Sequence, residues 1–119
     1  MKILISSKSK DSKGAVDKRF GRAEFYVIYN SETKAYDFVD NSAKDGAHGA
    51  GPKAAQIAID LGIDVIITGN LGPRALSVIE STPIKSYRID GVTVEENVQN
   101  YLDNKLEEIT SAGPSHAGN

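Results

Sequence analysis

Residues 45–74, DGAHGAGPKAAQIAIDLGIDVIITGNLGPR, decide the fold of this chain. A glycine–proline pair followed by a cation occurs near each end of the stretch, at residues 51–53 and 72–74. Proline fits the first helical position, because the N–H group that it lacks would have no partner there. Each pair therefore predicts the start of a helix. The β-branched run 64–68 between the pairs predicts a buried strand.

The rest of the chain predicts further strands and helices. Apolar and β-branched runs predict a central strand at 2–6, a hairpin at 24–30 and 34–40, and a last strand at 84–88. Helical spacing of apolar residues predicts helices over 52–61, 73–80 and 94–109, with Thr93 capping the last one. We expect a single domain of residues 1–110, followed by a flexible tail of small and polar residues, 111–119.

This order of elements predicts a three-layer α/β fold. Parallel strands need right-handed crossovers, which place the helices over a largely parallel sheet with one hairpin strand running backwards. Strands 2–6, 34–40 and 64–68 then end at one edge, which the loops 7–22, 41–51 and 69–73 share. Ligands of open α/β sheets bind at this carboxyl edge. Both glycine–proline helix starts lie there.

The two helix starts predict a binding site for an anion. The first turn of a helix carries unpaired N–H groups and a partial positive charge of about half a unit. Lys53 and Arg74 each add a full positive charge beside one of these starts. We therefore expect the two helix ends to point into one hollow and to bind a single guest.

Length and composition limit the possible classes of protein. The chain has 119 residues, of which 39% are hydrophobic and 25% charged, as in an ordinary globular domain. No apolar run approaches the ~20 residues of a membrane span, so we expect a cytoplasmic protein without a membrane partner. The absence of cysteine excludes disulfides, thiolate metal ligands and a cysteine nucleophile.

The net charge of -2 hides an uneven distribution. Residues 2–22 hold seven cations and two carboxylates, whereas residues 89–109 hold six carboxylates and one cation. The cationic end can attract an anionic ligand or an acidic protein, although solvated loop and helix faces give the same pattern.

No pattern in the chain predicts catalysis. A ribonuclease-H-type nuclease needs clustered carboxylates that hold two divalent ions, and the central strand 2–6 contains none. There is no Walker loop, and residues 49–52 fail the spacing of a dinucleotide-binding loop. No Ser-His-acid set is evident, although Ser6, Ser7 and His48 are expected at one edge. We therefore expect a non-enzymatic protein with no catalytic residues and no nucleic-acid partner.

Three motifs resemble those of a known family. They are RFGRA at 19–23 before a hydrophobic strand, HGAG at 48–51 opening a helix, and VIITGNLGP at 65–73. In this order, over roughly residues 1–105, they are similar to the dinitrogenase iron-molybdenum cofactor biosynthesis family, the NifX-like group that includes the C-terminal domain of NifB. The resemblance implies a ribonuclease-H-like fold with a five-stranded mixed sheet of order 3-2-1-4-5, strand 2 antiparallel. It also implies a carrier of nitrogenase cofactor or of its iron–sulfur precursors, with a protein partner in cofactor assembly.

The predicted cofactor-binding site combines these motifs with the helix starts. Its residues are Arg19, Phe20, Gly21, Arg22, His48, Gly49, Gly51, Lys53, Asn70, Gly72 and Arg74. His48 is the candidate metal ligand, because it stands in the loop where the resemblance places one. Arg19 replaces the histidine that is usual in the family, and a guanidinium group cannot coordinate a metal.

The same residues also have structural interpretations. His48 can be a loop histidine that bonds a backbone group, and Phe20 can be a core residue that anchors its loop. Arg22 can form an ion pair with Glu24 or Asp45. The glycines at 49, 51 and 72 can serve in turns and caps alone.

The leading hypothesis is therefore a carrier that holds an anionic iron–sulfur cluster, or an iron-molybdenum cofactor precursor, at the carboxyl edge. One alternative is a metal-independent binding or regulatory module for a phosphate-bearing small molecule. Another is an interaction domain whose basic loop docks on an acidic protein.

Overall fold

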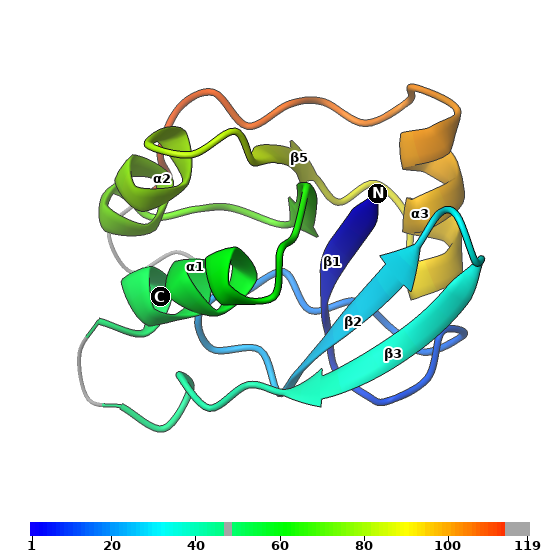
Figure 1. The fold of residues 1–119 in the computed structure, drawn as a ribbon, viewed down its shortest axis with the longest axis horizontal. Helices are drawn as coiled ribbons and strands as arrows, with labels where there is room; N and C mark the ends of the chain where they lie inside the picture. The colour runs from blue at the N-terminus through cyan, green and yellow to red at the C-terminus, as the bar shows by residue number, and fades with distance from the viewer. Residues whose placement is uncertain (47–48, 114–119) are drawn as a thin grey trace.

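The computed structural model describes residues 1–46 and 49–113 of the chain (Figure 1). In these ranges the strands are β1 (Lys2–Ser7), β2 (Phe25–Asn30), β3 (Ala35–Asp40), β4 (Val65–Thr68) and β5 (Lys85–Arg88). The helices are α1 (Ala50–Asp60), α2 (Pro73–Glu80) and α3 (Val94–Leu102). No helix among these residues is long and apolar enough to cross a bilayer.

The strands form one mixed sheet of order β3-β2-β1-β4-β5. β2 runs antiparallel to β1 and β3, whereas β4 runs parallel to β1 and β5. In the register of the central strand, Ile5 lies between Val27 of β2 and Ile67 of β4. The predicted α/β class, the implied strand order and the antiparallel second strand are all confirmed.

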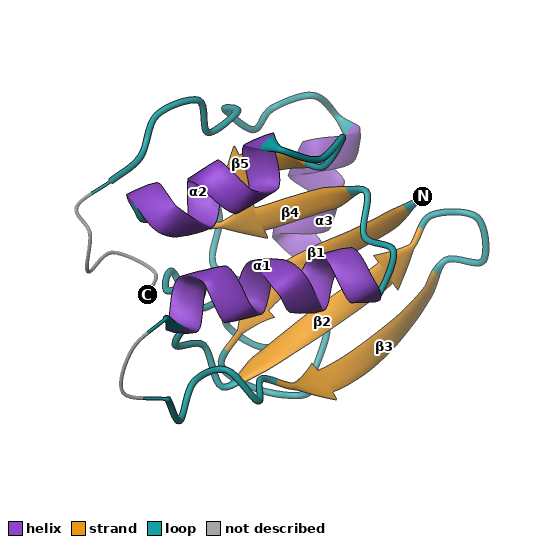
Figure 2. Cartoon of the chain, turned by 60° about the vertical axis from the view of Figure 1, so that its left-hand side comes forward, coloured by secondary structure: helices purple, strands orange, loops and turns teal. Residues whose placement is uncertain are grey.

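The sheet is the middle of three layers. α1 and α2 lie side by side on one face, and α3 covers the other (Figures 1 and 2). Alternate residues of β1 face opposite layers, so Leu4 packs in the core under α1 and α2 while Ile3 and Ile5 pack in the core under α3. A strand covered on both faces needs apolar residues at every position, which explains the unbroken apolar run.

The predicted start of the first helix was wrong by two residues. α1 begins at Ala50, and its N-cap is Gly49 with a φ of 74°. Pro52 is therefore the third helical residue rather than the first. It is tolerated there because the N–H groups of the whole first turn lack helical partners. The predicted start of α2 is confirmed, with Pro73 at the first position after Gly72.

The predicted end of the third helix was also wrong. α3 stops at Leu102 and not at Ile109. Asn104 has a φ of 60°, and the N–H groups of Asn104 and Lys105 donate to the carbonyls of Tyr101 and Asn100 at 3.0 and 2.8 Å. This pairing is a Schellman motif, in which asparagine tolerates the left-handed conformation that ends the helix.

The segment after α3 returns along the free edge of β5. Tyr87 and Glu108 form an antiparallel bridge, and the N–H of Ile109 donates to the carbonyl of Ser86 at 2.8 Å. Ile109 is buried in the core under α1 and α2, on the opposite face of the sheet from α3. Gly113 then donates to the carbonyl of Leu71 at 2.9 Å. The predicted tail thus begins with a bonded stretch, and its residues 114–119 lie outside the described part.

Candidate functional site

Three loops and two helix starts meet at the carboxyl edge of the sheet. We call this edge, which comprises residues 17–23, 41–46 and 68–72 with the first turns of α1 and α2, the rim. Figure 2 shows that α1 and α2 begin at the same end of the sheet. The predicted sharing of one edge by these loops is therefore observed, and the contacts between the loops explain how the edge is built.

Buried hydroxyl groups attach the first loop to the central strands. Ser6 of β1 and Thr68 of β4 are both fully buried, and their hydroxyl oxygens lie 2.8 Å apart. The Ser6 hydroxyl also donates to the carbonyl of Asp17 at 2.5 Å, and the N–H of Asp17 donates to the Ser6 carbonyl at 2.9 Å. Residue 17 is thus fixed directly over the end of the sheet.

The next two residues join this loop to the loop after β4. The N–H of Gly69 donates to the carbonyl of Lys18 at 3.2 Å, and Arg19 forms a parallel bridge with Asn70. A Cβ atom at Gly69 would overlap the carbonyl oxygen and the Cβ of Lys18. Glycine at 69 is required because the two backbones approach too closely for any side chain.

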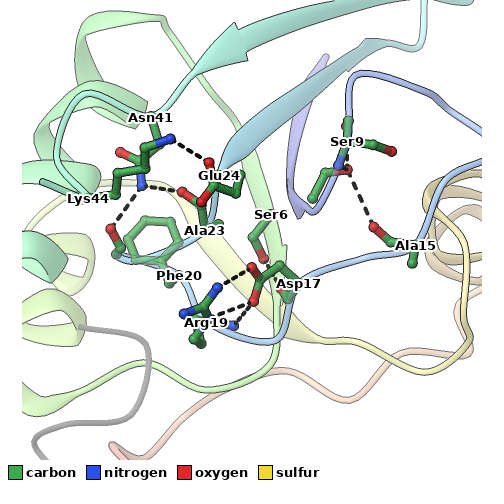
Figure 3. Close-up of polar contacts among 12 residues, drawn as sticks. Ser6, Ser9, Ala15, Asp17, Arg19, Phe20, Ala23, Glu24, Asn41 and Lys44 are labelled. Carbon is green, nitrogen blue, oxygen red and sulfur yellow. Dashed lines mark hydrogen bonds and ion pairs between the residues drawn. The ribbon is translucent and has the colours of Figure 1, made fainter.

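Asp17 and Arg19 form an ion pair with two parallel hydrogen bonds (Figure 3). Arg19 Nε lies 3.1 Å from Asp17 Oδ1, and Nη2 lies 3.0 Å from Oδ2. The N–H of Arg19 donates to Oδ1 as well, at 2.9 Å. The Asp17 side chain is 3% exposed and that of Arg19 is 59% exposed. Hydrogen bonding to Asp17 and its negative charge raise the pKa of Arg19, so its charge is permanent.

Phe20 is a core residue rather than an exposed contact. Its side chain is fully buried against the ring of Tyr26, and the Tyr26 hydroxyl donates to the Phe20 carbonyl at 2.6 Å. Burial, with a smaller contribution from the charge of Asp17, raises the pKa of Tyr26. The structural interpretation of Phe20 as the anchor of its loop is the one that the packing supports.

Asn41 connects the first loop to the loop after β3. Its side chain is buried, and its amide nitrogen donates to the carbonyls of Gly21 and Ala23 at 2.8 and 2.9 Å. Its side-chain oxygen accepts from the N–H of Ala43 at 2.9 Å. One amide thus satisfies three backbone groups and closes both loops.

Arg22 lies over the loop after β3. Its Nη1 donates to the carbonyls of Lys44 and Gly46 at 2.6 and 2.5 Å. Glu24, one predicted partner of Arg22, forms its ion pair with Lys44 at 2.5 Å. Arg22 therefore holds the backbone of residues 44–46 in place.

The helix starts at the rim differ from the start of α3. Thr93 and Glu96 form a capping box at α3, and Glu95 and Glu96 place two carboxylates in its first turn. The N-caps of α1 and α2 are Gly49 and Gly72, which provide no side-chain cap, and neither helix has an acidic residue in its first turn. Within the described ranges, the N-caps at the rim thus provide no side-chain acceptor like that of α3, which favours binding of an anion at these positive dipole ends.

The cations predicted beside the helix starts are accessible. Lys53 and Arg74 are exposed, as is Asn70, whereas Gly21, Gly51 and Gly72 are buried in the backbone of the rim. His48, the predicted metal ligand, lies outside the described residues. Within residues 1–46 and 49–113, no three His, Cys, Asp or Glu side chains come together as a metal site.

A cavity of about 260 Å³ lies away from the rim residues. It is bounded by α2, the turn into β5 and residues 108–110, with Leu76, Ile84 and Ile109 among its apolar walls. None of the predicted site residues lines it. The predicted site and this cavity are therefore separate features of the fold.

Two buried residues that hold the rim loops together, Asp17 and Asn41, were not predicted as site residues. Asp17 and Asn41 are both buried polar side chains that bond backbone N–H groups two residues later in the chain. Aspartate and asparagine commonly make such local bonds in turns, so their turn propensity was a readable signal. Their bonds to other loops depend on the tertiary structure and have no signature in the sequence.

Comparison with known proteins places the fold among named relatives. The family model described as dinitrogenase iron-molybdenum cofactor matches residues 1–104. An uncharacterised protein of Methanocaldococcus jannaschii is 34% identical over 93 residues, covering 76% of this chain and 79% of that protein. The apo form of the orange protein from Desulfovibrio gigas has a TM-score of 0.89 at 33% identity, covering 94% of this chain and 95% of that one. A Thermotoga protein of the DUF35 family, provisionally named NifB, has a TM-score of 0.82 at 34% identity, covering 94% and 96%.

Proposed function

The chain belongs to the dinitrogenase iron-molybdenum cofactor family, and on this premise we propose that it is a carrier that holds an anionic metal–sulfur cluster or cluster precursor at the rim. One observation carries the proposal. The two helices that begin at the rim have no side-chain cap and no acidic residue in their first turns, whereas α3 has both. A cluster that carries negative charge would supply the missing acceptors.

The charges around the rim favour the same kind of guest. Lys53 and Arg74 are exposed beside the two helix starts, and Arg19 is exposed on the neighbouring loop. The positive dipole ends and these three exposed cations raise the local concentration of an anion at the rim. The solved structure of the similar orange protein is that of its apo form, and an apo form is consistent with a protein that binds a group.

We assign the protein a binding role and no catalytic residue. His48 is the residue proposed to contact metal, because an imidazole nitrogen binds iron whereas the guanidinium at position 19 does not. The chain has no cysteine, so a thiolate ligand from this protein is impossible. A carrier of this kind passes its cargo to a protein partner in the assembly of the cofactor, and we place that exchange in the cytoplasm.

The test is anaerobic reconstitution with iron and sulfide, followed by absorption spectroscopy of the desalted protein. Wild type is expected to retain a coloured cluster, and Arg74→Ala to retain less because one positive charge beside α2 is lost. His48→Ala is expected to change the spectrum itself. Lys105→Ala, which removes an exposed cation after α3, is the matched control and should behave as wild type. A colourless wild-type protein would contradict the proposal.

A metal-independent site for a phosphate-bearing small molecule is the second candidate. It is favoured by the lack of any grouped metal-ligating side chains within the described ranges. Calorimetric titration with nucleotides and inorganic phosphate separates the two candidates. For a phosphate site, Arg74→Ala should weaken binding while His48→Ala leaves it unchanged.

A further inference from the structure

The ion pair between Asp17 and Arg19 uses only part of the hydrogen-bonding capacity of the guanidinium group. Asp17 occupies one edge of the guanidinium group, the edge formed by Nε and Nη2. A guanidinium has five N–H donors, and its outer edge, formed by Nη1 and the second hydrogen of Nη2, matches a second bidentate acceptor. Among the described residues, Asp17 is the hydrogen-bonding partner of the Arg19 side chain, and it leaves this outer edge unbonded.

We propose that Asp17 is a positioning residue that holds Arg19 as a bidentate anion clamp on the rim. This inference rests on the proposed binding function and specifies how the ligand is recognised. The preferred ligand is an anion with two acceptor atoms side by side, as on any tetrahedral oxyanion or its sulfur analogue. Recognition occurs through N–H donors, because position 19 cannot coordinate a metal.

The surroundings of the pair support a fixed rather than a mobile clamp. The Asp17 carboxylate is buried and accepts three hydrogen bonds from Arg19, and its backbone is bonded at both N–H and carbonyl to Ser6 of the central strand. A preorganised arginine loses less side-chain entropy when it binds a ligand. The Asp17 charge thus orients Arg19 without being exposed to the ligand.

The backbone places the clamp beside the second helix start. Arg19 bridges to Asn70, which stands two residues before Gly72, the N-cap of α2. The backbone of residue 19 therefore lies beside that of residue 70 on the rim, close in the chain to the start of α2. An anion between Arg19 and the start of α2 would receive donors from both sides.

Removing the charge of Asp17 gives opposite results under two interpretations. If Asp17 were only a nearby negative charge, Asp17→Asn would reduce repulsion and tighten anion binding. If Asp17 positions Arg19, the same change releases the guanidinium and weakens binding. The sign of the effect therefore distinguishes a positioning role from a simple electrostatic one.

The experiment is a titration of the intact chain with molybdate and with inorganic phosphate at low ionic strength. Calorimetry measures the affinity, and ¹⁵N NMR follows the Arg19 Nε–H signal and the backbone signals of residues 69–75. We expect Arg19→Ala to weaken binding about tenfold or more, because the variant loses charge-assisted hydrogen bonds to the anion. Asp17→Asn should weaken binding about threefold or more in the wild-type background and not at all in the Arg19→Ala background.

Each outcome decides the question. Equal or tighter binding by Asp17→Asn would overturn the positioning role. If Asp17→Asn does not fold, Arg19→Lys replaces it, because this exposed residue keeps its charge but loses the fork, and wild-type affinity in that variant would overturn the clamp. If wild type binds an anion at the rim while Arg19→Ala is unchanged, only this inference fails. If wild type shifts no rim signal with either anion, the anion-binding function itself fails.

Discussion

At the scale of single residues, buried polar side chains hold the rim loops in place. Ser6, Thr68, Asp17 and Asn41 are all buried. Thr68 bonds Ser6 across the two central strands, and Ser6, Asp17 and Asn41 each bond a loop. A buried polar group without a partner costs about 1–3 kcal/mol, so these residues tolerate few arrangements of the backbone around them. The exposed cations of the rim therefore stand on a backbone with a defined shape.

Tyr26 offers a test of this bonding through pH. Burial raises the pKa of Tyr26 in the folded protein, while the unfolded chain ionises near the ordinary value of about 10. The stability that wild type gains from a protonated Tyr26 is complete below about pH 10 and is lost as the pH rises further. Tyr26→Phe removes this dependence and also leaves the Phe20 carbonyl without its hydroxyl partner.

We therefore expect Tyr26→Phe to be less stable than wild type by about 1 kcal/mol at pH 8. Above pH 10 wild type should lose up to about 1.4 kcal/mol of stability per pH unit relative to the variant, so Tyr26→Phe should become the more stable protein by about pH 11.5. Urea denaturation of both proteins from pH 8 to pH 11.5 measures the two free energies of unfolding. A difference that stays constant over this range would show that Tyr26 ionises normally in the fold.

Residue types predicted part of this site. The sequence allowed Phe20 to be either a core residue or a ligand contact, and the structure places its aromatic ring in the core. Lys53 and Arg74 follow predictably from their positions after proline, because long charged side chains at a helix start stay in solvent. Asp17 was not identified as a site residue. Its bonds to Arg19 are local, but its burial results from its contact with the central strand, which the sequence around it does not indicate.

At the scale of elements, helix ends carry most of the differences between expectation and structure. Gly62 follows α1 and has the left-handed φ of 69° that is typical of a helix end. Asn104 does the same for α3, yet Leu106 and Ile109 continue the apolar spacing beyond it. A local stop signal outweighed that spacing, because Ile109 packs on the other face of the sheet.

The capping box of α3 gives the element-scale prediction. The Thr93 hydroxyl oxygen accepts from the N–H of Glu96 at 3.1 Å, and the Glu96 carboxylate accepts from the N–H of Thr93 at 3.3 Å. Thr93→Ala should lower the free energy of unfolding by about 1 kcal/mol, the usual cost of a lost cap. Thr110→Ala, at an exposed position, is the control and should change it by less than about 0.5 kcal/mol. Urea denaturation measures both, and equal stabilities of the two variants would exclude the cap.

At the scale of the whole molecule, the segment after α3 covers one edge of the sheet. The edge at β5 is covered by the chain itself, through the bridge of Tyr87 to Glu108 and the buried side chain of Ile109. The class and strand order were predictable, because alternating strands and crossover helices allow few topologies. This return of the chain was not predictable. Only residues 107–109 pair with β5, and so short a paired segment has no recognisable pattern in the sequence.

The returning segment also sets where the folding unit ends, which we propose is Gly113 rather than residue 110. Gly113 bonds the carbonyl of Leu71, the residue before the N-cap of α2, so the segment connects the covered edge to the rim. A chain ending at residue 113 keeps every described contact and should match the full chain within about 0.5 kcal/mol. A chain ending at residue 106 loses the bridge and the buried isoleucine together, and should be less stable by at least the cost of Ile109→Ala.

Ile109→Ala separates burial from chain length in this prediction. The side chain is 4% exposed, so truncation should cost about 2–5 kcal/mol, whereas Leu102→Ala at 44% exposure should cost far less. Urea denaturation of the two truncated chains and the two point variants gives four free energies of unfolding. If the chain ending at 106 is as stable as the full chain, the segment merely rests on β5. If Ile109→Ala accounts for the whole loss, its side chain, and not the strand pairing, holds the segment to the sheet.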